Sequence, residues 1–344
     1  MSRFCLPRDI YHGKGCLEEL KNLKGKKAIL VVGGGSMKRQ GFLDRAVGYL
    51  KEAGMEVQLF EGVEPDPSVE TVMKGAEAMR AFEPDWIVSM GGGSPIDAAK
   101  AMWAFYEYPD TTFEELCTPF NFPELRQKAK FCAIPSTSGT ATEVTAFSVI
   151  TNYQTGVKYP LADFNITPDV AIVDPDLVAG LPVKQVAYTG MDALTHAIEA
   201  YIGRSTTKQT RKAAIEAIQL IFQYLPVAYK NGKNRTARKE MLRASYLAGT
   251  AFTKSYVGYV HAVAHSLGGQ YGIPHGLANS VLLPIVLEAY GNAAHKKLAH
   301  LARITKLSSS PDDTTAANAF IAHIRKMNAS MNIPTTLVGI RDED

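Results

Sequence analysis

Residues 85–100 read DWIVSMGGGSPIDAAK, a short apolar run that ends in three glycines and a serine and continues as a helical pattern. The same order occurs earlier, where KKAILVV at 26–32 is followed by GGGS at 33–36. A glycine turn at the carboxyl end of a parallel strand lets backbone N–H groups approach a phosphate, and the dipole of the next helix favours the anion. The two turns therefore predict a dinucleotide site formed by Gly33, Gly34, Gly35, Ser36, Gly91, Gly92, Gly93 and Ser94.

A third turn, PSTSGTATE at 135–143, follows another apolar run and is rich in hydroxyl groups. Its side chains could bond ribose, phosphate or amide groups; the candidates are Ser136, Thr137, Ser138 and Thr140. Alternatively, Thr140 and Glu143 have the spacing of a capping box and would only cap a helix. The glycine turns also have a structural alternative, because neither is a GxGxxG fingerprint and tight turns need glycine anyway.

Around these turns, residues 26 to about 175 alternate β-branched runs with amphipathic helical segments. This alternation indicates a largely parallel sheet covered by helices on both faces. From about 184 to 329 the spacing is helical, with breaks at NGKN, GIPHG and SSSPDD. We expect an α/β domain over residues 1–180 and an all-helical domain over 181–344, with the boundary near 178–183.

Bulk composition agrees with a two-domain globular protein. The chain has 344 residues, of which 46% are hydrophobic and 21% charged, and its length exceeds the size at which single cores stop growing. Its 37 basic and 34 acidic residues are scattered, which gives no polyanion-binding block. There is no secretory signal or membrane-length apolar run, and the four cysteines form no CxxC pair. We expect a cytoplasmic protein that binds neither nucleic acid nor membrane.

Three of the chain's eight histidines fall in one nearly uncharged stretch, GYVHAVAHSLGGQYGIPHG at 258–276. His261 and His265 are four residues apart, and His275 follows a proline in a turn bounded by glycines. Upstream, GMDALTHAIEAY places Asp192 and His196 four apart on one helix face.

Taken singly, each of these histidines is best read as a hydrogen-bonded core residue. Together with the aspartate they form a carboxylate and imidazole set that favours Fe²⁺ or Zn²⁺. The remaining histidines have no partner at ligand spacing and are read as surface or core residues; they are His12, His295, His300 and His323.

The motifs GGGSPIDAAK, PSTSGTATEVT, DPDL, TGMDALTHAIEAY and HAVAHSLGGQYGIPHGLANS together resemble the iron-containing (group III) alcohol dehydrogenase family, from the first residues to about 305. The resemblance implies an N-terminal dinucleotide-binding domain and a helical C-terminal domain, as in the dehydroquinate synthase-like fold. It implies four metal ligands, which are Asp192, His196, His261 and His275. It places His265 beside the nicotinamide, and Asp97 of GGGSPIDAAK is included among the cofactor-binding residues.

The implied reaction is hydride transfer between NAD(P)(H) and a small primary alcohol or aldehyde. A divalent ion acting as a Lewis acid would lower the pKa of an alcohol or polarise a carbonyl, and His265 could relay the proton. The family implies Fe²⁺, although one Asp and three His would also accept Zn²⁺, Ni²⁺ or Co²⁺. A homodimer is expected.

The residues after the first strand bear on the choice of cofactor. Many NAD-using family members have an aspartate where this chain has Gly33 or Gly34, and losing that carboxylate removes repulsion of a 2′-phosphate. Ser36, Lys38 and Arg39 could bind the phosphate, although a solvated turn would also explain the two cations. We therefore expect NADP(H) to be favoured over NAD(H).

The end of the chain departs from the family pattern. Family members usually continue for a few more helices, whereas this sequence stops at TTLVGIRDED, so we expect a shortened C-terminus that leaves all four metal ligands in place. Two alternatives stay open at this point. One is an enzyme of the glycerol dehydrogenase or dehydroquinate synthase type, and the other is a non-catalytic protein that binds nucleotide or metal.

Overall fold

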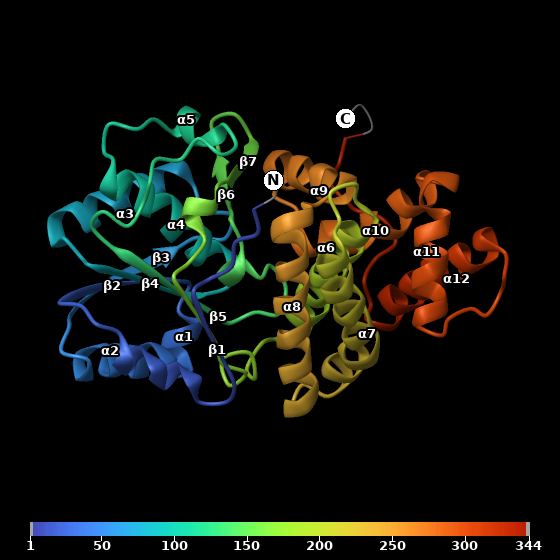
Figure 1. Cartoon of the computed structure of the whole chain (residues 1–344), viewed down its shortest axis with the longest axis horizontal. Helices are drawn as coiled ribbons and strands as arrows, with labels where there is room; N and C mark the ends of the chain where they lie inside the picture. Colours follow the sequence, from blue (N-terminus) through green and yellow to red (C-terminus); the bar gives the residue numbers. More distant parts are fainter. Residues whose placement is uncertain (1–2, 342–344) are drawn as a thin grey trace. The chain divides into compact units, whose positions relative to one another are not determined.

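The computed structural model describes residues 3–341, and Figure 1 shows the chain coloured along its sequence. The chain divides into two compact units, Met1–Leu181 and Pro182–Asp344. The first unit is an α/β domain built on a parallel sheet, and the described elements of the second unit are all helices. The predicted fold class is thereby confirmed.

The sheet of the first unit has six strands in the order β1-β8-β5-β4-β2-β3, and each neighbouring pair is parallel. The carboxyl ends of β2, β4 and β5 therefore meet at one edge, where the three turns singled out above begin. The strands are β1 (Asp9–His12), β2 (Lys27–Gly33), β3 (Glu56–Val63), β4 (Trp86–Gly91), β5 (Lys130–Pro135) and β8 (Val170–Val173). The helices are α1 (Ser36–Arg39), α2 (Phe42–Glu52), α3 (Val69–Phe82), α4 (Gly93–Glu107) and α5 (Phe113–Cys117), with 3₁₀ turns η1 (Cys16–Asn22), η2 (Thr142–Val144) and η3 (Phe164–Ile166).

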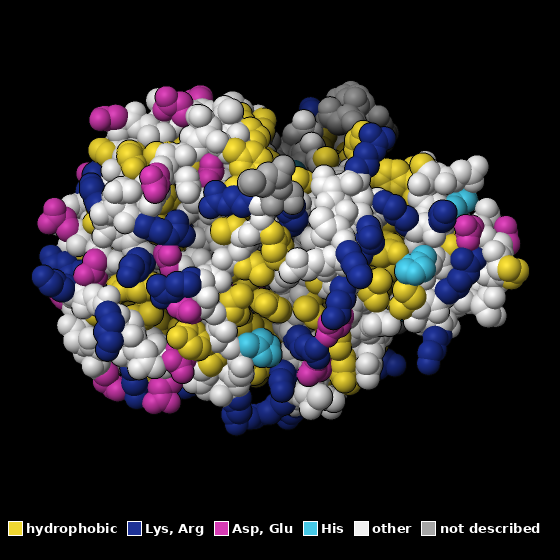
Figure 2. Space-filling model, viewed as in Figure 1, with side chains coloured by type: hydrophobic (Ala, Val, Ile, Leu, Met, Phe, Trp, Pro, Cys, Tyr) yellow, Lys and Arg dark blue, Asp and Glu magenta, His cyan; other side chains and the backbone are white. Residues whose placement is uncertain are grey.

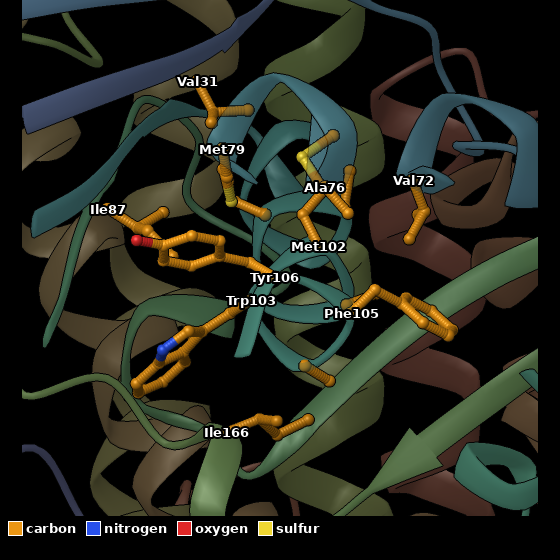
Figure 3. Close-up of a cluster of buried hydrophobic side chains, with 14 of the residues drawn as sticks. Val31, Val72, Ala76, Met79, Ile87, Met102, Trp103, Phe105, Tyr106 and Ile166 are labelled. Atoms are coloured by element: carbon orange, nitrogen blue, oxygen red, sulfur yellow. The ribbon is translucent and has the colours of Figure 1, made fainter. Parts of the chain in front are cut away.

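Both faces of this sheet are buried, because successive side chains of each strand point to opposite sides. On β2, Leu30 packs in a cluster with residues of α2 and η1, whereas Ile29 and Val31 pack in a second cluster with α3 and α4. Figure 3 shows this second cluster, in which Trp103 and Tyr106 of α4 lie near Ile87 of β4. Two buried faces explain why the strands read as continuous apolar runs.

A two-stranded antiparallel hairpin, β6 (Phe147–Asn152) and β7 (Val157–Ala162), is absent from the sequence-based expectation. Proline within a short apolar run argues against a strand, and β7 contains Pro160. In the structure Pro160 faces Val149, whose N–H donates instead to the carboxylate of Asp97 at 3.1 Å. Proline has no N–H to donate, and because Val149 turns its own N–H toward Asp97, this pair needs no hydrogen bond across the hairpin.

The described part of the second unit consists of seven helices, which occupy the span where helical spacing was expected. They are α6 (Val183–Ile202), α7 (Lys208–Lys230), α8 (Arg235–Ser255), α9 (Tyr259–Tyr271), α10 (His275–Ala289), α11 (Asn292–Ile304) and α12 (Asp313–Ser330). One boundary is corrected, because His275 was expected in a turn and is the first residue of α10. Pro274 has φ −55°, which is already suited to a helix start.

Small residues bring the helices of this unit close to α6. A Cβ on Gly276 of α10 would lie 2.5 Å from the carbonyl oxygen of Tyr188 on α6. Similarly, a Cβ on Gly190 of α6 would lie 2.4 Å from Leu225 of α7. The absence of a side chain at Gly276 therefore fixes how near the start of α10, with its histidine, approaches the helix that carries Asp192.

The surface carries no large block of one charge on the face of the first unit that Figure 2 shows, where Lys and Arg are interspersed with Asp and Glu. Within residues 3–341, no helix combines the length and apolar character that crossing a bilayer requires.

Candidate metal centre and dinucleotide pocket

Three helices of the second unit bring four predicted ligands together. Asp192 and His196 are on α6, His261 is on α9 and His275 is on α10. Figure 1 labels these three helices. Oδ1 of Asp192 lies 3.5 Å from Nε2 of His261 and 3.5 Å from Nε2 of His275. Nδ1 of His196 is 3.8 Å from the same oxygen. Residues separated by up to 83 positions in the chain thus converge on one carboxylate oxygen.

This arrangement fits a divalent first-row metal. Ligand atoms placed tetrahedrally about 2.0–2.2 Å from an ion are roughly 3.3–3.6 Å apart, close to the distances from Asp192 to the two imidazoles. Asp192, His261 and His275 each offer one ligand atom, and the three atoms lie within 4.8 Å of one another. A carboxylate with imidazoles suits Fe²⁺ and Zn²⁺ better than Ca²⁺ or Mg²⁺.

The charges within the cluster also favour a cation. Burial would raise the pKa of Asp192, but the imidazoles of His196, His275 and His261 outweigh it and hold that pKa well below its usual range. Asp192 is therefore ionised. Burial would lower the pKa of His261, yet hydrogen bonds to Asp192 and Glu199 raise it to about 9. A metal ion that binds His261 must displace this proton.

Glu199 is a further candidate for the site, and the sequence analysis missed it. Its Oε2 lies 2.6 Å from Nδ1 of His261, and its Oε1 accepts the N–H of Val260 at 2.8 Å. A Cβ on Gly258 would lie 2.8 Å from Oε1, so glycine there leaves room for the carboxylate. Carboxylates behind ligand histidines fix the tautomer and aim the other nitrogen at the metal. The available signal was helical spacing, since Glu199 follows Asp192 by seven residues.

His196 is held between two rings. Its imidazole stacks on Phe252 of α8 with centroids 4.2 Å apart and on His261 with centroids 4.3 Å apart. It is 5% exposed, so it forms the buried side of the cluster. By contrast, the side chain of His275 is 24% exposed, and the cluster opens to solvent on that side.

His265 lies beside this cluster. It follows His261 by one turn of α9, and its ring centroid is 5.0 Å from that of His275 and 6.0 Å from that of His261. It is partly exposed. His265 thus lies outside the group formed by Asp192, His261 and His275, beside the most exposed of these three side chains.

The first unit contains a pocket of about 210 Å³ at the carboxyl ends of β2 and β4. The first two glycine turns form much of its wall, together with the ends of β3 and α4. The lining residues predicted from sequence are Gly33, Gly34, Gly35, Ser36, Lys38, Gly91, Gly92 and Ser94. Of the described residues predicted for the cofactor, those outside this lining are Arg39, Gly93, Asp97, Ser136, Thr137, Ser138 and Thr140.

The third turn supports the second. The N–H of Ser136 donates to the carbonyl oxygen of Gly91 at 2.6 Å, and a Cβ on Gly93 would lie 2.9 Å from Cγ2 of Thr140. The capping-box alternative is wrong, because η2 begins after Ala141 and has no side-chain cap. The two turns are therefore packed directly against each other.

Asp97, on α4, contacts the end of this third turn. Its carboxylate accepts the hydroxyl of Thr142 at 2.5 Å, and Nζ of Lys100 donates to the carbonyl oxygens of Thr142 and Thr145 at 2.7 and 2.8 Å. Burial raises the pKa of Asp97 to about 6, although Lys100, Thr142 and the N–H of Val149 oppose it. These hydrogen bonds of Asp97 and Lys100 hold the turn in place.

Glu61 is the second residue that the sequence analysis missed. It lines the pocket at the end of β3, and its Oε1 is 3.5 Å from Nζ of Lys38. An acidic residue at the end of the second strand of a βαβ unit is the usual partner of a ribose 2′-hydroxyl, and this position was the signal available. Glu61 therefore places a negative charge beside the cation expected to bind a 2′-phosphate.

Comparison with known proteins covers both units. A family model described as iron-containing alcohol dehydrogenase matches residues 7–175, and one for the C-terminal part of the Fe-containing alcohol dehydrogenase family matches 186–344. The chain is 57% identical to the NADPH-dependent butanol dehydrogenase of Clostridium saccharobutylicum, over 100% of this chain and 88% of that protein.

Two further proteins support the comparison. The chain is 39% identical to the bifunctional aldehyde-alcohol dehydrogenase AdhE of Escherichia coli (strain K12), over 98% of this chain but only 41% of that longer protein. A crystal structure of 1,3-propanediol oxidoreductase superposes with a TM-score of 0.93 and 37% identity, over 100% of this chain and 91% of that one. The second family model covers nearly all of α6 and the whole of α9 and α10. The chain belongs to the iron-containing alcohol dehydrogenase family.

Proposed function

We propose that the protein interconverts short linear aldehydes and primary alcohols, with NADP(H) as the preferred hydride carrier and Fe²⁺ as the resident metal. The observation that carries this proposal is the convergence of Asp192, His261 and His275, with Glu199 behind His261. The butanol and 1,3-propanediol named for two similar proteins support a substrate of three or four carbons.

Asp192, His196, His261 and His275 would hold the ion. When bound, it supplies a Lewis acid that polarises a carbonyl or lowers the pKa of an alcohol. The ionised Asp192 offsets part of the positive charge, and the exposure of His275 leaves one side of the cluster open to a small molecule. The two more deeply buried imidazoles, those of His196 and His261, keep water away from the opposite side of the cluster.

We infer that His265 moves the hydroxyl proton. Its ring lies next to the exposed His275 and is itself partly exposed, so a proton can pass between a substrate hydroxyl and solvent through it, directly or through one water. Replacement of His265 should lower kcat while leaving the metal content unchanged.

Preference for NADP(H) rests on the first glycine turn. Gly33 and Gly34 present no carboxylate to a 2′-phosphate, and Lys38 lines the same pocket. The similar butanol dehydrogenase is NADPH-dependent, which agrees with this assignment. Glu61 opposes it by pairing with Lys38, so the preference is expected to be moderate.

Metal loading combined with a substrate panel tests the proposal. The purified protein is chelated, reloaded anaerobically with Fe²⁺, Zn²⁺ or Co²⁺, and assayed with propanal and butanal by the loss of NADPH or NADH absorbance. We expect the highest kcat/KM with Fe²⁺ and NADPH. Turnover that is equal in chelated and reloaded protein, or that requires NADH, would contradict the proposal.

Ligand variants complete the test. His261→Ala and His275→Ala should each lose bound metal and turnover together. His295→Ala on α11 is the matched control, because its ring bonds Thr314 rather than the cluster, and it should retain both. Full metal content in His261→Ala would show that the ion is held elsewhere.

A further inference from the structure

A fifth polar side chain reaches the metal cluster, from Asn279 on α10. It follows His275 by one helical turn and is fully buried. Its Nδ2 lies 2.8 Å from Oδ1 of Asp192, 3.2 Å from Nε2 of His261 and 3.0 Å from Nε2 of His275. One amide nitrogen thus contacts the same three atoms that would bind the ion.

The two ends of this carboxamide are used very unequally. The nitrogen has two hydrogens, and it donates one to Asp192 and the other to Nε2 of His275, while Nε2 of His261 lies beside it. The oxygen, Oδ1, is buried and has no hydrogen-bond partner among the described residues. A buried carbonyl oxygen without a donor costs roughly 1–3 kcal/mol, which calls for a compensating role.

A cation bound to these three ligand atoms would favour the opposite orientation of the amide. In the observed orientation the N–H bonds point their positive ends toward the three ligand atoms, which repels a metal ion there. Half a turn about the Cβ–Cγ bond exchanges nitrogen and oxygen without changing the shape of the side chain. The oxygen would then face the cation, and amide oxygens are suitable ligands for divalent metals.

We propose that Asn279 is a positioning residue with two orientations. Before metal binds, its N–H₂ group holds Asp192 and His275 together by donating to them. Once the ion binds, the side chain turns and offers Oδ1 to the cation. The proposal rests on the metal site proposed above, and it adds a residue outside the four ligands that the family resemblance implies.

The backbone of α10 supports such a rotation without helix movement. Gly276 presses the start of the helix against the carbonyl of Tyr188, and the side chain of Asn328 donates to the carbonyl oxygen of Ser280 at 2.7 Å. Asn279 lies between these two anchors. Its backbone is therefore held, and the exchange of nitrogen and oxygen needs a change in its terminal torsion alone.

Asn279→Leu and Asn279→Asp test the two orientations with Co²⁺ alone as the probe. The readouts are Co²⁺ affinity, the visible spectrum of bound Co²⁺, and the melting temperature of chelated protein. We expect Asn279→Leu to weaken Co²⁺ binding about ten- to hundredfold, as for groups that support metal ligands, and to lower the melting temperature of chelated protein. Asn279→Asp should destabilise chelated protein by repulsion from Asp192 but bind Co²⁺ at least as tightly as the wild type.

Thr167→Val is the control, because Thr167 is also buried and its Oγ1 has no hydrogen-bond partner among the described residues, but it belongs to the first unit. It should keep the wild-type Co²⁺ affinity and spectrum. Wild-type affinity and spectrum in both Asn279 variants would overturn the proposal while leaving the metal site intact. If the wild type itself binds no Co²⁺, or binds it equally as His261→Ala, the metal site and the proposal fail together.

Discussion

The carboxylate of Glu199 bridges two consecutive residues of α9, with Oε1 bound to the N–H of Val260 and Oε2 to Nδ1 of His261. A single acidic side chain from α6 therefore supplies an acceptor for the first turn of α9 and fixes the orientation of an imidazole. Because Glu199 is 2% exposed, both bonds are shielded from water. The start of the helix and the aim of its histidine are thus set by the same group.

Glu199→Gln separates these two tasks. A glutamine has one acceptor oxygen, so only one of the two N–H groups can be satisfied and Nδ1 of His261 loses its charged partner. We expect metal affinity to fall about ten- to hundredfold, measured by competition with a coloured chelator. Glu288→Gln, which removes only an exposed ion pair with Arg325, should leave affinity unchanged. Equal affinity in the two variants would argue against an orienting role.

Gly34→Asp is predicted to shift cofactor preference toward NADH. No atom lies within 4 Å of a Cβ at Gly34, whereas a Cβ at Gly33 would meet the carbonyl oxygen of Val63 at 3.1 Å, so position 34 is the one that admits aspartate. Its carboxylate would repel a 2′-phosphate and accept bonds from ribose hydroxyls. The ratio of kcat/KM for NADPH to that for NADH should fall. Gly48→Asp on α2 adds the same charge outside the pocket and should not change the ratio.

Local patterns were sufficient to predict most elements, because a parallel sheet with two buried faces and amphipathic helices leave strong periodic signals. Asp192, His196, His261 and His275 stood out because aspartate and histidine are uncommon on apolar helix faces. Glu199, Asn279 and Glu61 did not, since their residue types are ordinary on helices and strand ends. Their importance depends on which helices and strands become neighbours, and that is decided by tertiary contacts rather than by sequence spacing.

Ala141 occupies a backbone conformation that favours glycine. It has φ 51° and ψ 28° at the start of η2, in the turn packed against the second glycine turn. A Cβ in the left-handed region costs roughly 1–2 kcal/mol, partly offset by the larger entropy of glycine in the unfolded chain. Ala141→Gly should therefore raise the free energy of unfolding in urea by up to about 1 kcal/mol. Ala99→Gly, in the ordinary helix α4, should lower it, and a loss of stability in both variants would refute the strain at Ala141.

Glu143 of η2 is a buried acid near the Asp97 and Lys100 network. It is 1% exposed, and its Oε1 has no hydrogen-bond partner within the described part of the chain. Burial raises the pKa of Glu143 to about 7 from 4.5, although a bond to its own backbone N–H and the charge of Lys100 oppose the change. The folded protein therefore keeps a proton on Glu143 at pH values where the unfolded chain has released it.

The sign of the resulting pH dependence follows from proton counting. Between about pH 4.5 and 7 the folded state binds more protons than the unfolded state, so the free energy of unfolding falls as pH rises through this window. At about 1.4 kcal/mol per pH unit, the total loss from Glu143 is at most about 3 kcal/mol. Glu143→Gln carries no titrating proton, so urea unfolding should give similar stabilities at pH 4.5 and a growing advantage for the variant up to pH 7. Asp97, with its pKa raised to about 6, contributes the same trend to both proteins and cancels in their difference. A constant difference across this range would show that Glu143 is ionised in the folded protein throughout.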